Sequence, residues 1–164
     1  MRNKGFNAIE LIILLLIVGI VAIAMITNFI PSLTATRLEA AKWKLKSDII
    51  YAQALAVTQQ LNHGVVFDAG LNKYSVYRQN TTNIVNEPST KLPFTVNYAT
   101  DPNFKGVAIS GTSFGSPTTD RVEFDSFGVP SDGALNLTVN GTVTLSSGTS
   151  SGTITVIKNT GKAD

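Results

Sequence analysis

One carboxylate stands out among the residues that could do chemistry, because Glu10 lies within an apolar stretch. Residues 11–26 include no charged side chain, and Ala8 and Ile9 extend the stretch on the other side of the glutamate. An ionised side chain at membrane depth costs on the order of 2.5–3.5 kcal/mol on insertion scales, so such groups are usually paired and functional. The sequence therefore predicts that Glu10 pairs with a positive charge; the alternative is a carboxylate that snorkels to the membrane interface.

The other reactive side chains predict little catalytic chemistry. The chain has one histidine, His63, and no cysteine, which excludes a disulfide, a thiol nucleophile and a cysteine-based zinc site. His63 falls in an Asn-His-Gly sequence that favours a solvent-exposed turn. The main acidic concentration predicts a solvated strand edge rather than a calcium site; it consists of Asp120, Glu123, Asp125 and Asp132. We expect no enzymatic activity, no bound metal and no cofactor.

The segment that carries Glu10 is long enough to cross a membrane. About 20 helical residues span a bilayer core, and the apolar stretch covers residues 11–30. Arg2 and Lys4 precede it, and basic residues on this side predict a cytoplasmic amino terminus. Two interpretations are a secretory signal peptide, cleaved after Ala22-Ile23-Ala24, and an uncleaved single-pass anchor.

A third interpretation places a processing site before the apolar stretch, at Lys4-Gly5-Phe6. Glu10 would then be the fifth residue of the mature chain. Gly5, Phe6 and Glu10 in this register resemble the class III signal of type IV pilins and type II secretion pseudopilins. The resemblance implies cleavage between Gly5 and Phe6 by a prepilin peptidase, N-methylation of Phe6, and a role for Glu10 in assembly.

This arrangement also has a physical logic. Cleavage after Gly5 would leave a positively charged amino terminus on Phe6, at the cytoplasmic edge of the membrane. Glu10 lies about one helical turn further on, where it meets the terminus of a shifted neighbouring subunit more easily than its own. Two charges that are each costly in lipid would then neutralise one another only when subunits assemble.

A helix-forming composition continues beyond the apolar stretch, with Pro31 as an expected kink. Two apolar stripes recur at helical spacing on roughly opposite sides of this helix. The first stripe consists of Leu38, Ala41, Leu45, Ile49, Ala52 and Ala56, and the second of Trp43, Ile50, Ala54, Val57 and Leu61. A helix that is apolar on two sides must bury both faces against other parts of the protein or against partners. We expect its own globular domain to bury one face. Either neighbouring subunits or a loop of the same chain would bury the other face.

After residue 63 the chain changes to short β-type runs separated by turn residues. Residues 65–67 and 74–77 predict a hairpin. Further strands are predicted at 94–98, 107–110, 121–125, 135–139, 142–145 and 153–157. Asn140-Gly141 predicts a two-residue hairpin turn between two of these strands. Because no βαβ alternation is present, the sheet should be mainly antiparallel.

These patterns predict an α+β fold, in which a long N-terminal helix, hydrophobic and then amphipathic, packs on a mainly antiparallel C-terminal β-sheet domain. We expect a leader at 1–5, a transmembrane and polymerisation half of the helix at 6–30, an amphipathic half at 31–62 and a globular β domain at 63–164. This is also the pilin architecture. Downstream residues are similar to GspH and FimT minor subunits, and the similarity leaves only about 80–120 uncovered. The similar segments are 37–40, 52–54, 65–67, 124–128, 141–145 and 154–162.

The resemblance implies a structural minor subunit, either a pilin of a type IV pilus or a pseudopilin of a type II secretion filament. Its partners would be other pilin or pseudopilin subunits, the prepilin peptidase, the inner-membrane assembly platform and, before assembly, inner-membrane lipid. It would be single-pass in a bacterial inner membrane, with a cytoplasmic amino terminus and a periplasmic globular domain, and later part of a periplasmic or cell-surface filament. A major filament pilin and an exported protein with an ordinary signal peptide stay open as alternatives.

DNA binding is the remaining alternative, because FimT-like minor pilins are implicated in DNA uptake through a basic C-terminal tail. Lys158 and Lys162 are the candidate residues, but the arginines usual to that tail are missing. The formal net charge of +2 adds little, since loss of Arg2 and Lys4 with the leader would leave 11 basic and 11 acidic side chains. Two lysines would bind DNA weakly at physiological salt.

Overall fold

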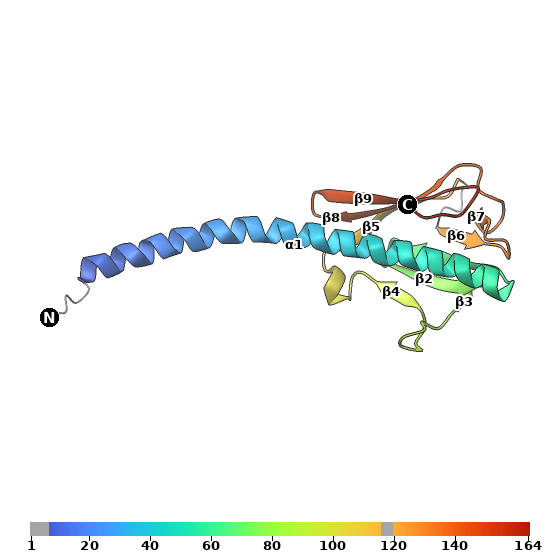
Figure 1. Cartoon of the computed structure of the whole chain (residues 1–164), viewed down its shortest axis with the longest axis horizontal. Helices are drawn as coiled ribbons and strands as arrows, with labels where there is room; N and C mark the ends of the chain where they lie inside the picture. Colours follow the sequence, from blue (N-terminus) through green and yellow to red (C-terminus); the bar gives the residue numbers. More distant parts are fainter. Residues whose placement is uncertain (1–6, 116–119) are drawn as a thin grey trace.

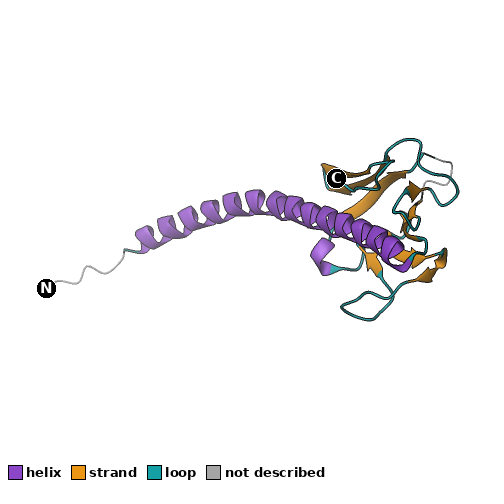
Figure 2. Ribbon diagram, turned by 45° about the vertical axis from the view of Figure 1, so that its right-hand side comes forward, coloured by secondary structure: helices purple, strands orange, loops and turns teal. Residues whose placement is uncertain are grey.

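The computed structural model describes residues 7–115 and 120–164, without the side chains of residues 24–32. One long helix, α1 (Ala8–Gln59), dominates the molecule. Its second half, residues 34–59, lies across a β domain (Figures 1 and 2). Its first half, residues 8–33, extends away from that domain and is called the arm below. The structure therefore confirms the predicted arrangement of a long N-terminal helix packed on a C-terminal β domain.

Helix α1 contains 52 residues and is about 78 Å long at the usual rise of 1.5 Å per residue. It is continuous through residue 31, so Pro31 does not end the helix. It ends at Gln60, which adopts the left-handed conformation (φ 54°) that closes many helices. No helix in the described part of the chain is both long enough and apolar enough to cross a membrane. The span expected at residues 11–30 stays a prediction.

The first sheet has six strands, and each of them is antiparallel to its neighbours. Their order is β3-β2-β1-β6-β7, with β4 also paired with β2. The strands are β1 (His63–Asp68), β2 (Lys73–Arg78), β3 (Asn80–Ile84), β4 (Thr95–Asn97), β6 (Arg121–Phe124) and β7 (Pro130–Ser131). The predicted hairpin is confirmed as β1–β2, in which Val65 pairs with Val76. Strands β3 and β4 share the outer edge of β2.

The second sheet has the order β5-β8-β9 and is also antiparallel. It consists of β5 (Val107–Ser113), β8 (Gly141–Ser147) and β9 (Ser150–Val156); a short 3-10 helix, η1 (Pro102–Phe104), precedes it. Asn72, in the β1–β2 turn, connects the two sheets. Its side-chain amide donates to the Val107 carbonyl (2.8 Å) and its carbonyl accepts from the Ile109 N–H (2.8 Å). One side chain thus bonds to β5 as a neighbouring strand would.

Of the two predicted apolar stripes of α1, the first is the one that the β domain covers, and it lies in the hydrophobic core. Each of its six residues is at most 3% exposed; they are Leu38, Ala41, Leu45, Ile49, Ala52 and Ala56. Apolar side chains from both sheets join them in one cluster, including Val65 of β1 and Ile154 of β9. Since burial of a large aliphatic side chain stabilises a fold by about 1.5–3 kcal/mol, this stripe holds the helix on the sheets.

The predicted strand at 135–139 is wrong. The Asp132 carboxylate accepts the N–H groups of Ala134 and Leu135 (both 2.8 Å), which turns the chain before a ladder can form. Only an isolated bridge between Ser131 and Asn136 remains. Leu137 is buried, whereas Leu135 is exposed. The alternation of apolar and polar residues at 135–139 therefore does not mark a strand, because only Leu137 of its leucines is buried.

The predicted turn at Asn140-Gly141 is also wrong, because Gly141 is the first residue of β8 and pairs with Val156. Strand β8 forms a hairpin with β9 instead, and the two-residue turn of that hairpin is Gly148-Thr149, between the paired residues Ser147 and Ser150. Gly148 has a positive φ (59°), which suits glycine. Gly141 serves packing instead, since a Cβ at this position would collide with the Phe114 ring.

Candidate assembly surface

The arm of α1 exposes its apolar side chains on every side. All large aliphatic residues between Ile9 and Ile23 are 46–67% exposed. A helix that is hydrophobic all round requires an apolar environment, supplied by lipid or by other helices. The arm is therefore a surface that the described part of the chain leaves uncovered, since it extends away from the β domain (Figure 1).

Glu10 lies in the first turn of the arm and is exposed. Its backbone N–H donates to the Asn7 carbonyl (2.9 Å), and a carboxylate at this end of a helix interacts favourably with the helix dipole. Among the described residues no cation forms an ion pair with Glu10. Gly5 and Phe6, the residues of the expected processing site, lie outside the described residues, so their role stays a prediction.

A buried polar contact positions the second half of α1 on the first sheet. The Tyr74 hydroxyl donates to the Asp48 carboxylate (2.6 Å), and Lys44 forms an ion pair with the same carboxylate (2.9 Å). Burial raises the pKa of the Asp48 carboxyl group, although the hydrogen bonds from Tyr74 and Lys44 oppose that shift. Burial also raises the pKa of Tyr74 well above its ordinary value. The hydroxyl therefore stays protonated and keeps its role as donor.

Gln53 connects α1 to two loops that are distant in the sequence. Its side-chain amide donates to the carbonyls of Gly128 (2.9 Å) and Thr160 (2.7 Å). Gly161 approaches this amide so closely, at a positive φ of 67°, that only glycine suits the position. These bonds fix the 125–129 turn and the C-terminal segment against the helix.

The second apolar stripe of α1 is largely exposed, on the side of the helix roughly opposite the buried stripe, as the helical spacing predicted. Trp43 is 66% exposed, and Ile50 and Val57 are also exposed. Within the described residues, the 125–129 turn approaches Val57 but leaves it 43% exposed, and Ile50 is 44% exposed. A neighbouring subunit as the cover of this stripe stays an expectation from the sequence.

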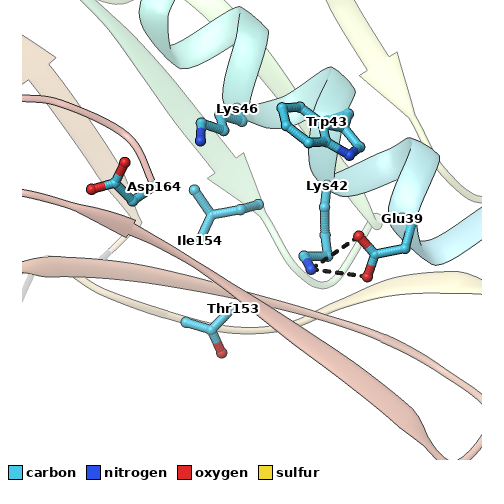
Figure 3. Close-up of a pocket in the computed structure, with 7 residues that line it drawn as sticks. All are labelled: Glu39, Lys42, Trp43, Lys46, Thr153, Ile154 and Asp164. Carbon is cyan, nitrogen blue, oxygen red and sulfur yellow. Dashed lines mark hydrogen bonds and ion pairs between the residues drawn. The ribbon is translucent and has the colours of Figure 1, made fainter.

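A pocket of about 210 Å³ lies where this stripe meets β9 (Figure 3). Its lining residues come from α1, from β9 and from the C-terminal segment; they are Glu39, Lys42, Trp43, Lys46, Thr153, Ile154 and Asp164. Lys42 forms an ion pair with Glu39 (2.9 Å), and the Lys46 ammonium lies 5.3 Å from the centre of the Trp43 ring. The sequence alone could not predict this pocket, because Lys42 and Thr153 become neighbours only through the fold.

The four acidic residues singled out from the sequence do not converge on one point. Glu123 accepts hydrogen bonds from Tyr77 and from the Asn62 amide (both 2.9 Å), while Asp125 and Asp132 each accept backbone N–H groups of their own turns. Within residues 7–115 and 120–164, no three metal-ligating side chains form a group that could hold a metal ion.

The two lysines considered for DNA binding are both engaged. Lys158 donates to the Thr138 carbonyl (2.9 Å). Lys162 forms an ion pair with Asp164 (2.8 Å), and this contact lowers the pKa of the Asp164 carboxyl group. Both lysines are exposed but already have a protein partner, and DNA binding through them stays untested.

The expectation that His63 is a solvent-exposed turn residue is wrong. His63 is fully buried and begins β1, where it pairs with Arg78 on one side and Phe124 on the other. Its Nδ1 lies 2.8 Å from the Leu61 carbonyl and therefore carries the proton that bonds there. The Asn-His-Gly sequence indicated a turn, but the turn is complete one residue earlier, so the imidazole lies inside the sheet.

Taken together, the helical arm, the buried inner stripe and the two antiparallel sheets define a pilin-like fold. The minor pseudopilin EpsH from the Type 2 Secretion System of Vibrio cholerae shares this fold. It is 10% identical, with a TM-score of 0.56 over 78% of this chain and 94% of that chain. The type IV minor pilin FimU of Pseudomonas aeruginosa is 12% identical, with a TM-score of 0.50 over 79% of this chain and 88% of that chain.

These similarities agree with the pilin and pseudopilin family suggested by residues 5, 6 and 10, and they confirm the predicted fold class. At 10–12% identity they show the fold alone. No protein-family model matches the chain, and no curated protein matches it in sequence.

Proposed function

We propose that this chain is a structural, non-enzymatic subunit of a pilin-like filament, and specifically a minor pilin or pseudopilin. The observation that carries the proposal is the arm of α1, whose apolar side chains from Ile9 to Ile23 have no cover among the described residues. A filament core made of such arms would bury them. The shared fold with a minor pseudopilin and a minor pilin supports the same function.

Before assembly, the proposed environment of the arm is the inner membrane, with the β domain in the periplasm. The apolar stretch at residues 11–30 and the basic residues before it support this orientation. A prepilin peptidase would cleave between Gly5 and Phe6, Phe6 would be N-methylated, and the assembly platform would transfer the subunit into the filament.

Glu10 is proposed to select the correct register between neighbouring arms. It is the only charged residue from position 5 to position 36, so an unpaired Glu10 carboxylate would be costly inside a bundle of apolar helices. The amino terminus of Phe6 on an adjacent subunit would neutralise it. A subunit that lacks the carboxylate would lose this pairing while keeping its apolar surface.

Two measurements on the full chain test the proposal. The intact mass of the mature protein should correspond to a start at N-methylated Phe6, whereas a start at Met25 would indicate an ordinary signal peptide and contradict it. Glu10→Ala should leave cleavage unchanged and reduce incorporation into filaments. Asn7→Ala is the matched control, because Asn7 lies beside the same turn and its side chain caps no helix N–H. Equal filament recovery for both variants would count against the charge-pairing role.

A further inference from the structure

Strand β9 lies at one edge of the second sheet, because the order of that sheet is β5-β8-β9. In an antiparallel ladder, alternate residues direct their backbone N–H and C=O groups toward the neighbouring strand, and the residues between them direct these groups outward. Thr155 is an outward residue of β9, since it exchanges two backbone hydrogen bonds with Asp164 of the C-terminal segment (both 2.9 Å). The ladder with β8 is regular, so Thr153 and Ser151 are outward residues as well.

The C-terminal segment covers only part of this edge. Its pairing with β9 reaches Thr155 and goes no further along the strand. The outward backbone groups of Thr153 and Ser151 have no hydrogen-bond partner among the described residues, and both residues are exposed. These groups are called the open edge of β9 below. A row of unpaired donors and acceptors at the edge of a sheet is a template for another extended chain.

The open edge borders the pocket between α1 and β9, which is called the Trp43 pocket below (Figure 3). Gly152 lies between the two residues of the open edge and faces α1, because a Cβ at this position would meet the side chain of Lys42. In an added antiparallel strand, the residue opposite Gly152 would direct its side chain to the same face. That side chain would enter the pocket, where the Trp43 ring and the buried Ile154 offer apolar surface.

The charges of the pocket favour an uncharged side chain. Its lining contains two lysines and two carboxylates, so their formal charges cancel. Lys42 is paired with Glu39 (2.9 Å), and Asp164 with Lys162 (2.8 Å). The pKa of the Asp164 carboxyl group is lowered mainly by the hydrogen bond from Lys162, and the charge of Lys46 acts in the same direction. With a volume of about 210 Å³, the pocket suits one apolar side chain.

A second copy of this chain does not suit the open edge. Two copies of β9 that pair antiparallel would be related by a two-fold axis perpendicular to the sheet and would close as a dimer. Such an axis reverses the direction of α1, which lies across the sheet (Figure 1). The two arms would then point in opposite directions and could not lie side by side in one membrane or one bundle. Pairing with another segment of a second copy would repeat from copy to copy, which a minor subunit does not do.

We propose that the open edge of β9 pairs with an extended segment of a different pilin-like subunit, and that this segment places an uncharged apolar side chain in the Trp43 pocket. In recognition by strand addition, main-chain hydrogen bonds give affinity and pockets for alternate side chains give specificity. The bonds between Thr155 and Asp164 already show an extended chain paired with this edge. The inference rests on the proposed filament function, and it names the surface through which the β domain contacts its neighbour.

Photo-cross-linking of the full chain in the membranes and filaments of the expressing cells tests the contact. The probe is p-benzoylphenylalanine in place of Ser151, whose exposed side chain lies on the open edge. Illumination should join the chain to an extended segment of another pilin-like subunit, identified by sequencing the cross-linked peptide. The same probe in place of Leu71, which is exposed in the β1–β2 turn, should give no such product. A product with a second copy alone, or no product at Ser151, would overturn the inference.

Substitutions give a second readout. Thr153→Pro removes one outward N–H, and proline is tolerated on an edge strand where that N–H faces solvent. It should reduce incorporation into filaments roughly tenfold, because an added strand would lose a main-chain hydrogen bond and meet the proline ring. Thr153→Val is the matched control, since it keeps the N–H and the β-branched shape, and it should leave incorporation unchanged. Trp43→Ala, which removes a wall of the pocket, should also reduce incorporation.

The outcomes separate the contact from the fold and from the proposed function. Thermal unfolding of the three variants in detergent should stay close to that of the unsubstituted chain; if Thr153→Pro alone unfolds earlier, Trp43→Ala and the cross-link decide. If incorporation depends on Glu10 but neither Thr153→Pro nor Trp43→Ala reduces it, strand addition is wrong and the filament function stands. A mature chain starting at Met25, with incorporation insensitive to Glu10, would contradict the filament function itself.

Discussion

The Tyr74 hydroxyl and the Asp48 carboxylate are 2.6 Å apart in the buried interface between α1 and the first sheet. Most contacts of this interface are apolar, and this hydrogen bond is directional. A helix held by an aliphatic stripe alone could shift by a turn at moderate cost, because its ridges repeat. Pairing Asp48 with Tyr74 specifies one position of the helix, and so fixes where the arm leaves the domain.

The pair makes stability depend on pH. Burial raises the pKa of Asp48 in the folded chain, so the folded state binds a proton at pH values where the unfolded state has lost it. The contribution of this group to the free energy of unfolding is therefore fully present below its ordinary pKa of 3.8 and is lost as pH rises through the raised pKa. In urea unfolding of the full chain in detergent, Asp48→Asn should gain stability relative to the unsubstituted chain as pH increases from about 4 to 7.

A second variant checks the cause of this dependence. The ammonium group of Lys44 opposes the rise in the pKa of Asp48. Lys44→Met should therefore raise the pKa of Asp48 further and move the pH-dependent part of the unfolding curve to higher pH. Parallel stability curves for the unsubstituted chain and both variants would show that Asp48 does not titrate in this range.

The two hydrogen bonds that the Gln53 amide donates to the Gly128 and Thr160 carbonyls should contribute measurably to the stability of the fold. Gln53→Ala leaves the carbonyls of Gly128 and Thr160 without their donor, which should cost about 1–2 kcal/mol in the free energy of unfolding. Gln59→Ala is the matched control, because Gln59 is an exposed glutamine in the last turn of the same helix. Chemical denaturation measures both variants. Equal losses would mean that the effect comes from the helix and not from these two hydrogen bonds.

The sequence could predict those parts of the fold in which apolar residues recur at the spacing of a helix or a strand over a short stretch of chain. The inner stripe of α1 was predictable because helical spacing places Leu38, Ala41 and Leu45 on one face whatever covers them. The second stripe, on the opposite side, followed from the same spacing. The β1–β2 hairpin was predictable from two β-type runs around a polar turn.

The parts that could not be predicted depend on contacts between distant residues. Alternation at 135–139 satisfied a strand pattern, but the Asp132 side chain takes the N–H groups that a strand would use. The Trp43 pocket needs β9 beside α1, and the 125–129 turn needs Gln53. Burial of His63 depends on pairing with β6, some sixty residues away.

Gly141 should tolerate no side chain. A Cβ at this position would collide with the ring of Phe114, which is itself buried, so neither group can move easily. Gly141→Ala is expected to reduce the free energy of unfolding by about 1–3 kcal/mol through overpacking. Gly111→Ala, in the partner strand β5, should change stability little because no atom lies within 4 Å of its added Cβ. Similar thermal midpoints for the two variants would contradict this packing role.

The C-terminal lysines should not support DNA binding at physiological salt. The Lys158 ammonium bonds to the Thr138 carbonyl, and Lys162 is paired with Asp164, so binding DNA would require breaking both contacts. Two phosphate contacts would give a log–log slope of affinity on salt of only about −1.8, and correspondingly weak binding. We expect no band shift of duplex DNA by the full chain in detergent at about 0.15 M salt, near the physiological value. A shift that Lys158→Ala and Lys162→Ala abolish, while the exposed Lys105→Ala leaves it intact, would overturn this expectation and restore the DNA interpretation.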